Sequence, residues 1–212
     1  MNVKLLLVLS LVISMVGCSP KIYTAGDFGQ ALSKHKVVAI LPGDVTMQLR
    51  PNQMRQMKPG EMDDLTAKTG RDIQEKMYGW FLRRSDKFHY TVTFQDVSRT
   101  NAILSKAGIS AAILATTDKA ELARLLGVDA VLQNRSRMEK PMSEGAAVAV
   151  GVLVGAWGAT NKVETTINIH DGGTGNLLWK YDYEASGSVG SSTTRLVDNL
   201  MRNASKKFPY KS

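Results

Sequence analysis

Residues 162–181 read KVETTINIHDGGTGNLLWKY, and this stretch decides the fold that the sequence predicts. Apolar and polar side chains alternate over residues 162–170, which is the period of a strand with one buried face. Residues 171–176 are glycine, aspartate, threonine and asparagine, all of which favour turns. Because residues 177–181 are mostly apolar again, the stretch predicts an antiparallel β-hairpin.

The sequence before and after the hairpin alternates between strand and helix patterns. Residues 37–41 form a short apolar run ended by a proline, which predicts a buried central strand. Ile73, Met77 and Phe81 recur at helical spacing and predict a long amphipathic helix over residues 63–85. Further strands are expected at residues 90–94 and 128–138, and further helices at residues 97–106, 117–126 and 193–207.

This order of elements defines the expected fold class. Helices separated by strands, followed by a hairpin, predict an α/β (α+β) fold in which a mixed β-sheet carries packed helices. We expect a single domain over residues 36–212, a length sufficient for one full core. Residues 43–61 contain two prolines and two glycines and are expected to form a long loop.

The N-terminal region predicts export and lipid attachment. Residues 5–16 are an apolar run preceded by a lysine, as in an export signal, and the run ends in Gly17-Cys18-Ser19. Cysteine directly after glycine resembles a lipobox, so we expect a signal peptide over residues 1–17, an acylated Cys18 and a tether over residues 18–35. An uncleaved membrane anchor and an ordinary secretory signal are the alternatives, although a bilayer-spanning helix needs about 20 apolar residues.

Residues 145–160 read GAAVAVGVLVGAWGAT and carry no charge. A transmembrane helix, an internal segment folded against the domain and an exposed apolar element are the three interpretations. The first is disfavoured because the apolar stretch is too short to span a bilayer as a helix and its glycines weaken a helix. An exposed element would serve self-association or membrane contact, through the candidate residues Val148, Val150, Val152, Leu153, Val154 and Trp157.

The chain is basic, with a formal net charge of +8. The densest basic positions are residues 83–84, 135–140 and 206–207, and they do not form one tract. A solvated surface and attraction to anionic lipid or lipopolysaccharide are both compatible with this pattern. We expect no nucleic-acid partner, because an exported domain meets little nucleic acid.

No catalytic motif is present in the sequence. His35, His89 and His170 lack metal-ligand spacing, and each is expected to be a surface or strand residue. Asp44, Asp171 and Glu164 have no partner visible in the sequence. The sequence therefore predicts no catalytic residue, no metal site, no cofactor and no small-molecule substrate.

Three segments in a fixed order carry a family resemblance: residues 37–42, residues 123–132 and residues 163–179. Together with the lipobox they resemble the envelope lipoproteins related to the curli-secretion channel subunit, a group that includes the lipoprotein activator of a penicillin-binding protein. The resemblance implies a mixed-sheet domain similar to the N-terminal domain of the Tol-system β-propeller protein. It also implies binding and assembly work rather than catalysis.

The sequence leaves three functional hypotheses open. The leading one is a lipoprotein of the outer membrane whose periplasmic domain forms a homo-oligomer or binds an envelope protein. A pore or secretion-channel subunit is the alternative. It is disfavoured because residues 142–162 leave room for at most two short strands, whereas a transmembrane strand needs about 9–11 residues. An envelope enzyme is the third and would require a cleft in which polar groups converge.

Overall fold

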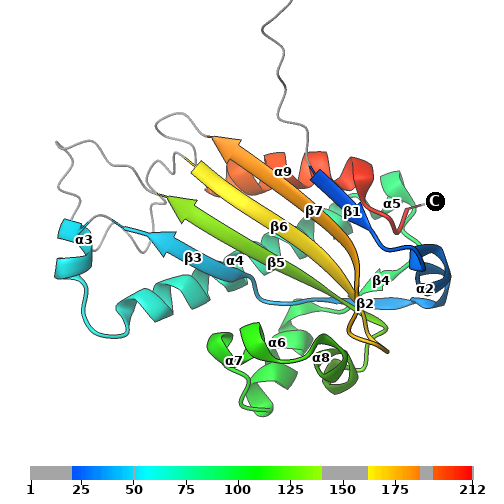
Figure 1. Cartoon of the computed structure of the whole chain (residues 1–212), viewed down its shortest axis with the longest axis horizontal. Helices are drawn as coiled ribbons and strands as arrows, with labels where there is room; N and C mark the ends of the chain where they lie inside the picture. Colours follow the sequence, from blue (N-terminus) through cyan, green and yellow to red (C-terminus); the bar gives the residue numbers. More distant parts are fainter. Residues whose placement is uncertain (1–20, 50, 140–161, 187–192, 212) are drawn as a thin grey trace, which may run out of the picture.

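The computed structural model describes residues 21–49, 51–139, 162–186 and 193–211 as one mixed α/β domain (Figure 1). Its seven-stranded sheet has the order β1-β7-β6-β5-β2-β4, and β3 pairs with β5 beyond the end of β2. The expected fold class is therefore confirmed. The strands are β1 (Lys21–Thr24), β2 (Val37–Ile40), β3 (Asp44–Gln48), β4 (Thr93–Phe94), β5 (Ala130–Glu139), β6 (Lys162–Asp171) and β7 (Leu177–Ser186). The helices are α2 (Phe28–Lys34), α3 (Pro51–Gln56), α4 (Glu61–Arg83), α5 (Ser85–Phe88), α6 (Val97–Lys106), α7 (Ala111–Thr116), α8 (Lys119–Leu126) and α9 (Thr193–Lys207).

Strand β5 is the centre of the sheet. It pairs in parallel with β2 and β3 along one side and antiparallel with β6 along the other. The hairpin predicted from residues 162–181 is confirmed as β6 and β7, with a bulge between Ile169 and His170. Strand β7 continues beyond the stretch from which the hairpin was predicted, to Ser186.

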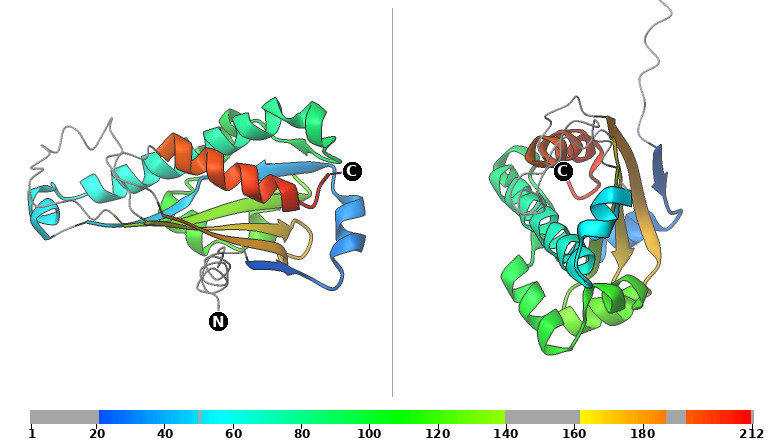
Figure 2. Two further views of the ribbon diagram at one scale, coloured as in Figure 1. Left: turned by 90° about the horizontal axis from the view of Figure 1, so that it is seen from above. Right: turned by 90° about the vertical axis from the view of Figure 1, so that its left-hand side faces the viewer.

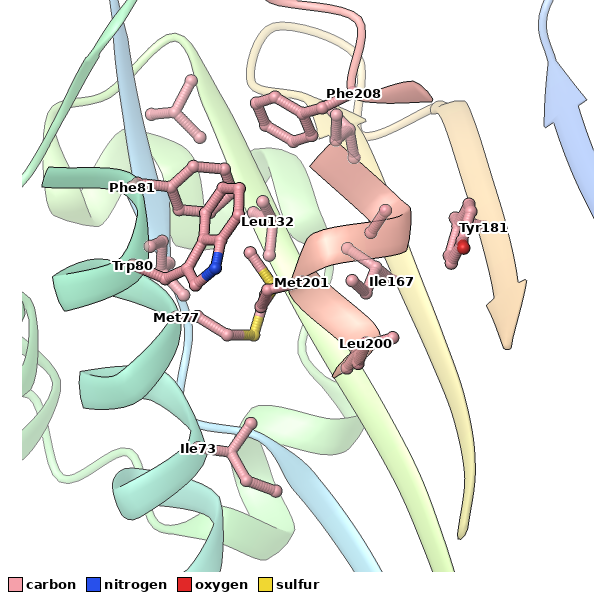
Figure 3. Packing of buried hydrophobic residues seen from close by; sticks show 14 of the residues in the cluster. Ile73, Met77, Trp80, Phe81, Leu132, Ile167, Tyr181, Leu200, Met201 and Phe208 are labelled. Atoms are coloured by element: carbon pink, nitrogen blue, oxygen red, sulfur yellow. The ribbon is translucent and has the colours of Figure 1, made fainter. Parts of the chain in front are cut away.

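The two faces of the sheet carry different helices. Helices α4 and α9 lie side by side on one face (Figure 2), where they bury the large aromatic and aliphatic side chains shown in Figure 3. On the other face, a smaller cluster packs α6, α7 and α8 against β2 and β5. Side chains alternate between faces along a strand, so Val38 and Ile40 enter the first cluster while Ala39 and Leu41 enter the second.

Helix α4 lies against the sheet in direct backbone contact. The amide of Gly43, which lies between β2 and β3, donates a hydrogen bond of 3.0 Å to the carbonyl of Gly70 in α4. A Cβ atom on Gly70 would lie 2.1 Å from the Gly43 carbonyl oxygen. One turn further on, the buried amide of Gln74 donates to the carbonyl of Ile40 at 2.7 Å and also pairs with Asn101 of α6. These contacts fix the height of α4 above the sheet.

Helix α8 has the ends that its sequence predicts. Asp118 accepts hydrogen bonds from the amides of Ala120 and Glu121, which is the N-cap arrangement. The hydrogen bond from the Glu121 amide is the largest of the effects that lower the pKa of Asp118. At the other end Gly127 has φ +67°, the left-handed conformation that ends many helices and that glycine adopts without strain.

Three segments differ from expectation. Residues 43–61 were expected as a loop but contain β3 and α3, and α7 has no counterpart among the predicted helices. The expected tether over residues 18–35 contains β1, which pairs with β7, and α2. All four residues of β1 are exposed, so β1 carries no apolar period from which it could be predicted. Helix α2 has one short apolar repeat, Phe28 and Leu32, whose side chains are partly buried against the core.

Two glycine substitutions in α4 should have opposite effects. We expect Gly70→Ala to lower the free energy of unfolding by more than about 2 kcal/mol, because the new methyl group overlaps backbone that cannot move freely. Gly79→Ala is the matched control: its Cβ meets only the mobile end of Arg83, at 3.3 Å. Better helix propensity should raise the free energy of unfolding by about 0.5–1 kcal/mol. Urea unfolding of both variants tests this, and equal effects would contradict the backbone contact.

Candidate functional site

The residues that the sequence singled out for membrane or partner contact lie outside the described part of the chain. They are Cys18, Val148, Val150, Val152, Leu153, Val154 and Trp157. The described strands nevertheless fix where the flanking segments join the domain. Glu139 at the end of β5 is opposite Lys162 at the start of β6, which in turn is opposite Ser186 at the end of β7. Strand β1 runs parallel to β6, so the chain enters β1 at Lys21 from the direction of this same end of the sheet.

The uncovered part of the sheet is polar. The face that carries α6, α7 and α8 is uncovered beyond α8, and this open face presents charged side chains from neighbouring strands, several of which pair. Arg135 donates to Asp44 at 2.8 Å, and Lys180 lies 3.1 Å from Asp182, which also accepts from Thr166. Exposed pairs of this kind contribute little to stability. They do leave this face with balanced charges.

A buried hydrogen-bonded triad joins three distant parts of the chain. His35 follows α2 and is 3% exposed. Its Nε2 lies 3.0 Å from Oδ1 of Asp171, and its Nδ1 lies 2.6 Å from the hydroxyl of Tyr210. A carboxylate can only accept, so we assign Nε2 as the donor to Asp171 and the Tyr210 hydroxyl as the donor to Nδ1. The expectation that His35 is a surface or strand residue is wrong, because this triad satisfies both ring nitrogens in the interior.

The two acidic members of the triad have shifted pKa values. Burial raises the pKa of Tyr210, and the nearby charges of Asp171 and Asp129 raise it further. Burial also acts to raise the pKa of Asp171, but hydrogen bonds from His35 and from the amide and hydroxyl of Thr174 outweigh it, so the pKa of Asp171 lies below its usual value of 3.8. Asp171 is therefore held as a carboxylate. It binds the hairpin turn through Thr174 and also binds the ring of His35.

The other titratable candidates do not converge on this triad. His170 directs Nδ1 at the carbonyl of Gly175, 3.1 Å away, and burial lowers its pKa. Asp44 is on the open face with Arg135. The Lys119 ammonium, whose pKa is lowered by burial and then by the charge of Arg135, donates to two carbonyls at the end of α7. Asp171 thus lies in the triad, whereas Lys119 is within electrostatic reach of both Asp44 and His170.

The described ranges hold neither a metal site nor a membrane-spanning helix. No group of three histidine, cysteine, aspartate or glutamate side chains in residues 21–49, 51–139, 162–186 and 193–211 is placed to hold a metal ion. Among the helices of this part of the chain, none is both long enough and apolar enough to cross a membrane.

Comparisons with known proteins give fold-level likenesses at low identity. No family model and no curated protein matches the chain. It is similar to lipoprotein GNA1162 from Neisseria meningitidis, with 13% identity over 81% of this chain and 94% of that one, at a TM-score of 0.42. It is similar to the C-terminal domain of LpoB from Salmonella enterica, with 12% identity over 76% and 93% of the two chains, at a TM-score of 0.38. A PelC dodecamer from Paraburkholderia phytofirmans matches at 10% identity over 87% and 95%, at a TM-score of 0.42.

With TM-scores below 0.5, these likenesses carry no argument about the activity or partners of this chain. The resemblance to the envelope lipoproteins related to the curli-secretion channel subunit stays a prediction.

The triad makes stability depend on pH in a predictable direction. Because the pKa of Asp171 is lower in the folded state, its contribution is complete above the usual value of 3.8 and is lost as the pH falls through the folded value. We expect Asp171→Asn to lower the free energy of unfolding by about 1–3 kcal/mol at pH 7. The difference from the unmodified protein should shrink below a pH of about 3.8.

The matched control for this measurement is Asp72→Asn, which removes an exposed pair with Lys68 on α4. We expect it to cost at most about 0.5 kcal/mol at either pH. Urea unfolding at both pH values measures all three proteins. An Asp171→Asn effect no larger than the control effect at pH 7 would show that the triad does not stabilise the fold.

Proposed function

We propose that the chain is a bacterial lipoprotein, held at the outer membrane by an acyl group on Cys18. Its domain acts in the periplasm as a non-enzymatic assembly or interaction component of the envelope. The observation that carries this proposal is Gly17-Cys18-Ser19 directly after the apolar run of residues 5–16. More than one acyl chain would hold the protein far more firmly than a single chain can.

The position of β1 gives this proposal a geometric consequence. Only Ser19 and Pro20 separate Cys18 from Lys21, the first residue of β1. Three residues of extended chain span at most about 10 Å, and β1 is hydrogen-bonded to β7. An acyl group on Cys18 would therefore hold the edge of the sheet at the bilayer surface, without the tether over residues 18–35 that the sequence predicts.

We further propose that residues 145–160 make the contact with a second copy or an envelope partner. Support comes from the strands that flank this segment, since Glu139 and Lys162 lie at the same end of the sheet toward which β1 begins. The segment is uncharged and apolar, which is unusual for a solvent-exposed part of a monomer. A contact made at this end would lie close to the proposed anchor.

Loss of the acylated cysteine should abolish lipid attachment. When expressed in a Gram-negative host with labelled palmitate, the unmodified chain should carry the label and the mass of a lipidated N-terminus. We expect Cys18→Ala to carry neither, while the neighbouring substitution Ser19→Ala keeps both. Gel fluorography and intact-mass measurement provide the two readings. Label on the Cys18→Ala chain, or on none of the three proteins, would contradict the proposal.

Replacement of residues 145–160 by a glycine-serine segment of equal length should remove self-association or partner binding. The measurements are the mass in detergent by light scattering and the set of envelope proteins recovered after crosslinking. The control is the double substitution Ile113→Ser and Leu125→Ser, which removes exposed apolar side chains from α7 and α8 and should leave both unchanged. An unaltered mass together with unaltered partners would refute the proposed contact. Conductance of the unmodified chain in planar bilayers would instead support a pore subunit.

A further inference from the structure

Basic side chains from three distant segments gather at the end of the domain where α4 and α9 both terminate. The sequence placed residues 83–84 and 206–207 among its densest basic positions, without a connection between them. In the structure, Phe81 of α4 and Phe208 after α9 have ring centroids 4.8 Å apart, so the two helix ends meet. The basic residues at this end are Lys34, Lys36, Arg83, Arg84, Lys87, Lys206, Lys207 and Lys211, called here the cationic end.

Backbone contacts hold the three segments together. Lys211 pairs with Tyr90 as an isolated bridge just after α5. The amide of Thr93, which begins β4, donates to the carbonyl of Lys36 at 2.8 Å. The triad links the α2 side to the C-terminal side, because His35 lies between Lys34 and Lys36 and contacts Tyr210. The cationic end is therefore a fixed surface of the folded domain, formed only when these segments come together.

The basic side chains of the cationic end form no ion pair within the described part of the chain. Two carboxylates lie nearby and keep their negative charge, but neither is paired with any of the eight. Asp129 accepts from the amides of Lys36 and Val37, and Asp171 accepts from His35 and Thr174. Asp86 of α5 is the acidic side chain exposed among them. The open face of the sheet, where Arg135 and Lys180 are paired, differs in this respect.

The side chains at this end have the character of a membrane-binding surface. Six of the eight are lysines, which act as mobile point charges and do not require the fixed geometry of a bidentate site. Leu82 is 51% exposed and lies directly before Arg83 and Arg84 at the end of α4. An exposed leucine beside basic residues matches the arrangement by which proteins attach to anionic bilayer surfaces.

We infer that the cationic end binds the headgroups of anionic phospholipids and forms a second attachment to the membrane. This inference rests on the proposed function, because a lipid on Cys18 would bring the bilayer within about 10 Å of β1. From Lys21 the chain runs away from the end that carries Glu139 and Lys162 and reaches Lys34 and Lys36 through α2. The cationic end would therefore meet the bilayer with the exposed edge of β1 lying along the membrane surface. A polybasic surface together with an acyl anchor gives far more stable attachment than either alone. Each basic residue near an anionic bilayer strengthens binding by about fivefold.

The test uses the full chain carrying Cys18→Ser, so that no acyl group contributes. Cosedimentation compares vesicles that contain phosphatidylglycerol with vesicles of phosphatidylcholine alone. We expect tighter binding to the anionic vesicles, lost in about 1 M salt, where the screening length falls to about 3 Å. In the same background, the triple substitution Lys87→Gln, Lys206→Gln and Lys207→Gln should weaken binding to anionic vesicles at least tenfold.

The matched control is the triple substitution Arg99→Gln, Lys106→Gln and Arg124→Gln, which removes the same charge from exposed positions on α6 and α8. We expect it to weaken binding less than threefold. Equal losses in the two triple variants, or equal binding to both kinds of vesicle, would overturn the inference. Binding to double-stranded DNA or alginate without binding to anionic vesicles would also overturn it, in favour of a soluble polyanion. Because no acyl group is present, these outcomes are independent of whether Cys18 is lipidated.

Discussion

The fold depends on the way strand β5 shares its two edges among three other strands. Its first residues pair with β2 and its last five with β3, while its full length pairs with β6. A slip of one residue in any of these pairings would exchange the two faces of the strand. That exchange would bring Val131 into the α4–α9 core and move Leu132 to the face of α8. The helices on both faces thus hold the register of β5, and β5 in turn places β3 where Gly43 meets Gly70.

Sequence periodicity was sufficient to predict the helices and strands that bury one face. The hairpin of β6 and β7, helix α4 and helix α9 have strong alternation or helical spacing, and the structure has them within a few residues of the expected bounds. Strand β1 was missed because an edge strand with every side chain exposed has no apolar pattern. Strand β3 was missed because none of its five positions is buried and because it lies between Pro42 and Pro51. In both cases pairing with a distant strand, rather than local preference, produces the element.

The triad of His35, Asp171 and Tyr210 had no local signal either. Its other two members are 136 and 175 residues from His35, so spacing along the chain could not connect them. The cationic end is a similar case, because the basic pairs at residues 83–84 and 206–207 meet only through the parallel course of α4 and α9 (Figure 2). The candidates for lipid attachment and partner contact, in contrast, came from the sequence alone.

The positions of the N-terminal partners have a consequence for the order in which the domain can fold. Strand β1 pairs with β7, β2 pairs with β5, and His35 contacts Tyr210, so the first part of the domain has its native partners only in later parts. Contacts between residues so far apart form slowly, because a long loop must close before they contribute. During synthesis the N-terminal region therefore remains open until nearly the whole domain has been made. A chain with these pairings cannot complete its native fold until β7 and Tyr210 have been made, so its last residues decide when the first ones become ordered.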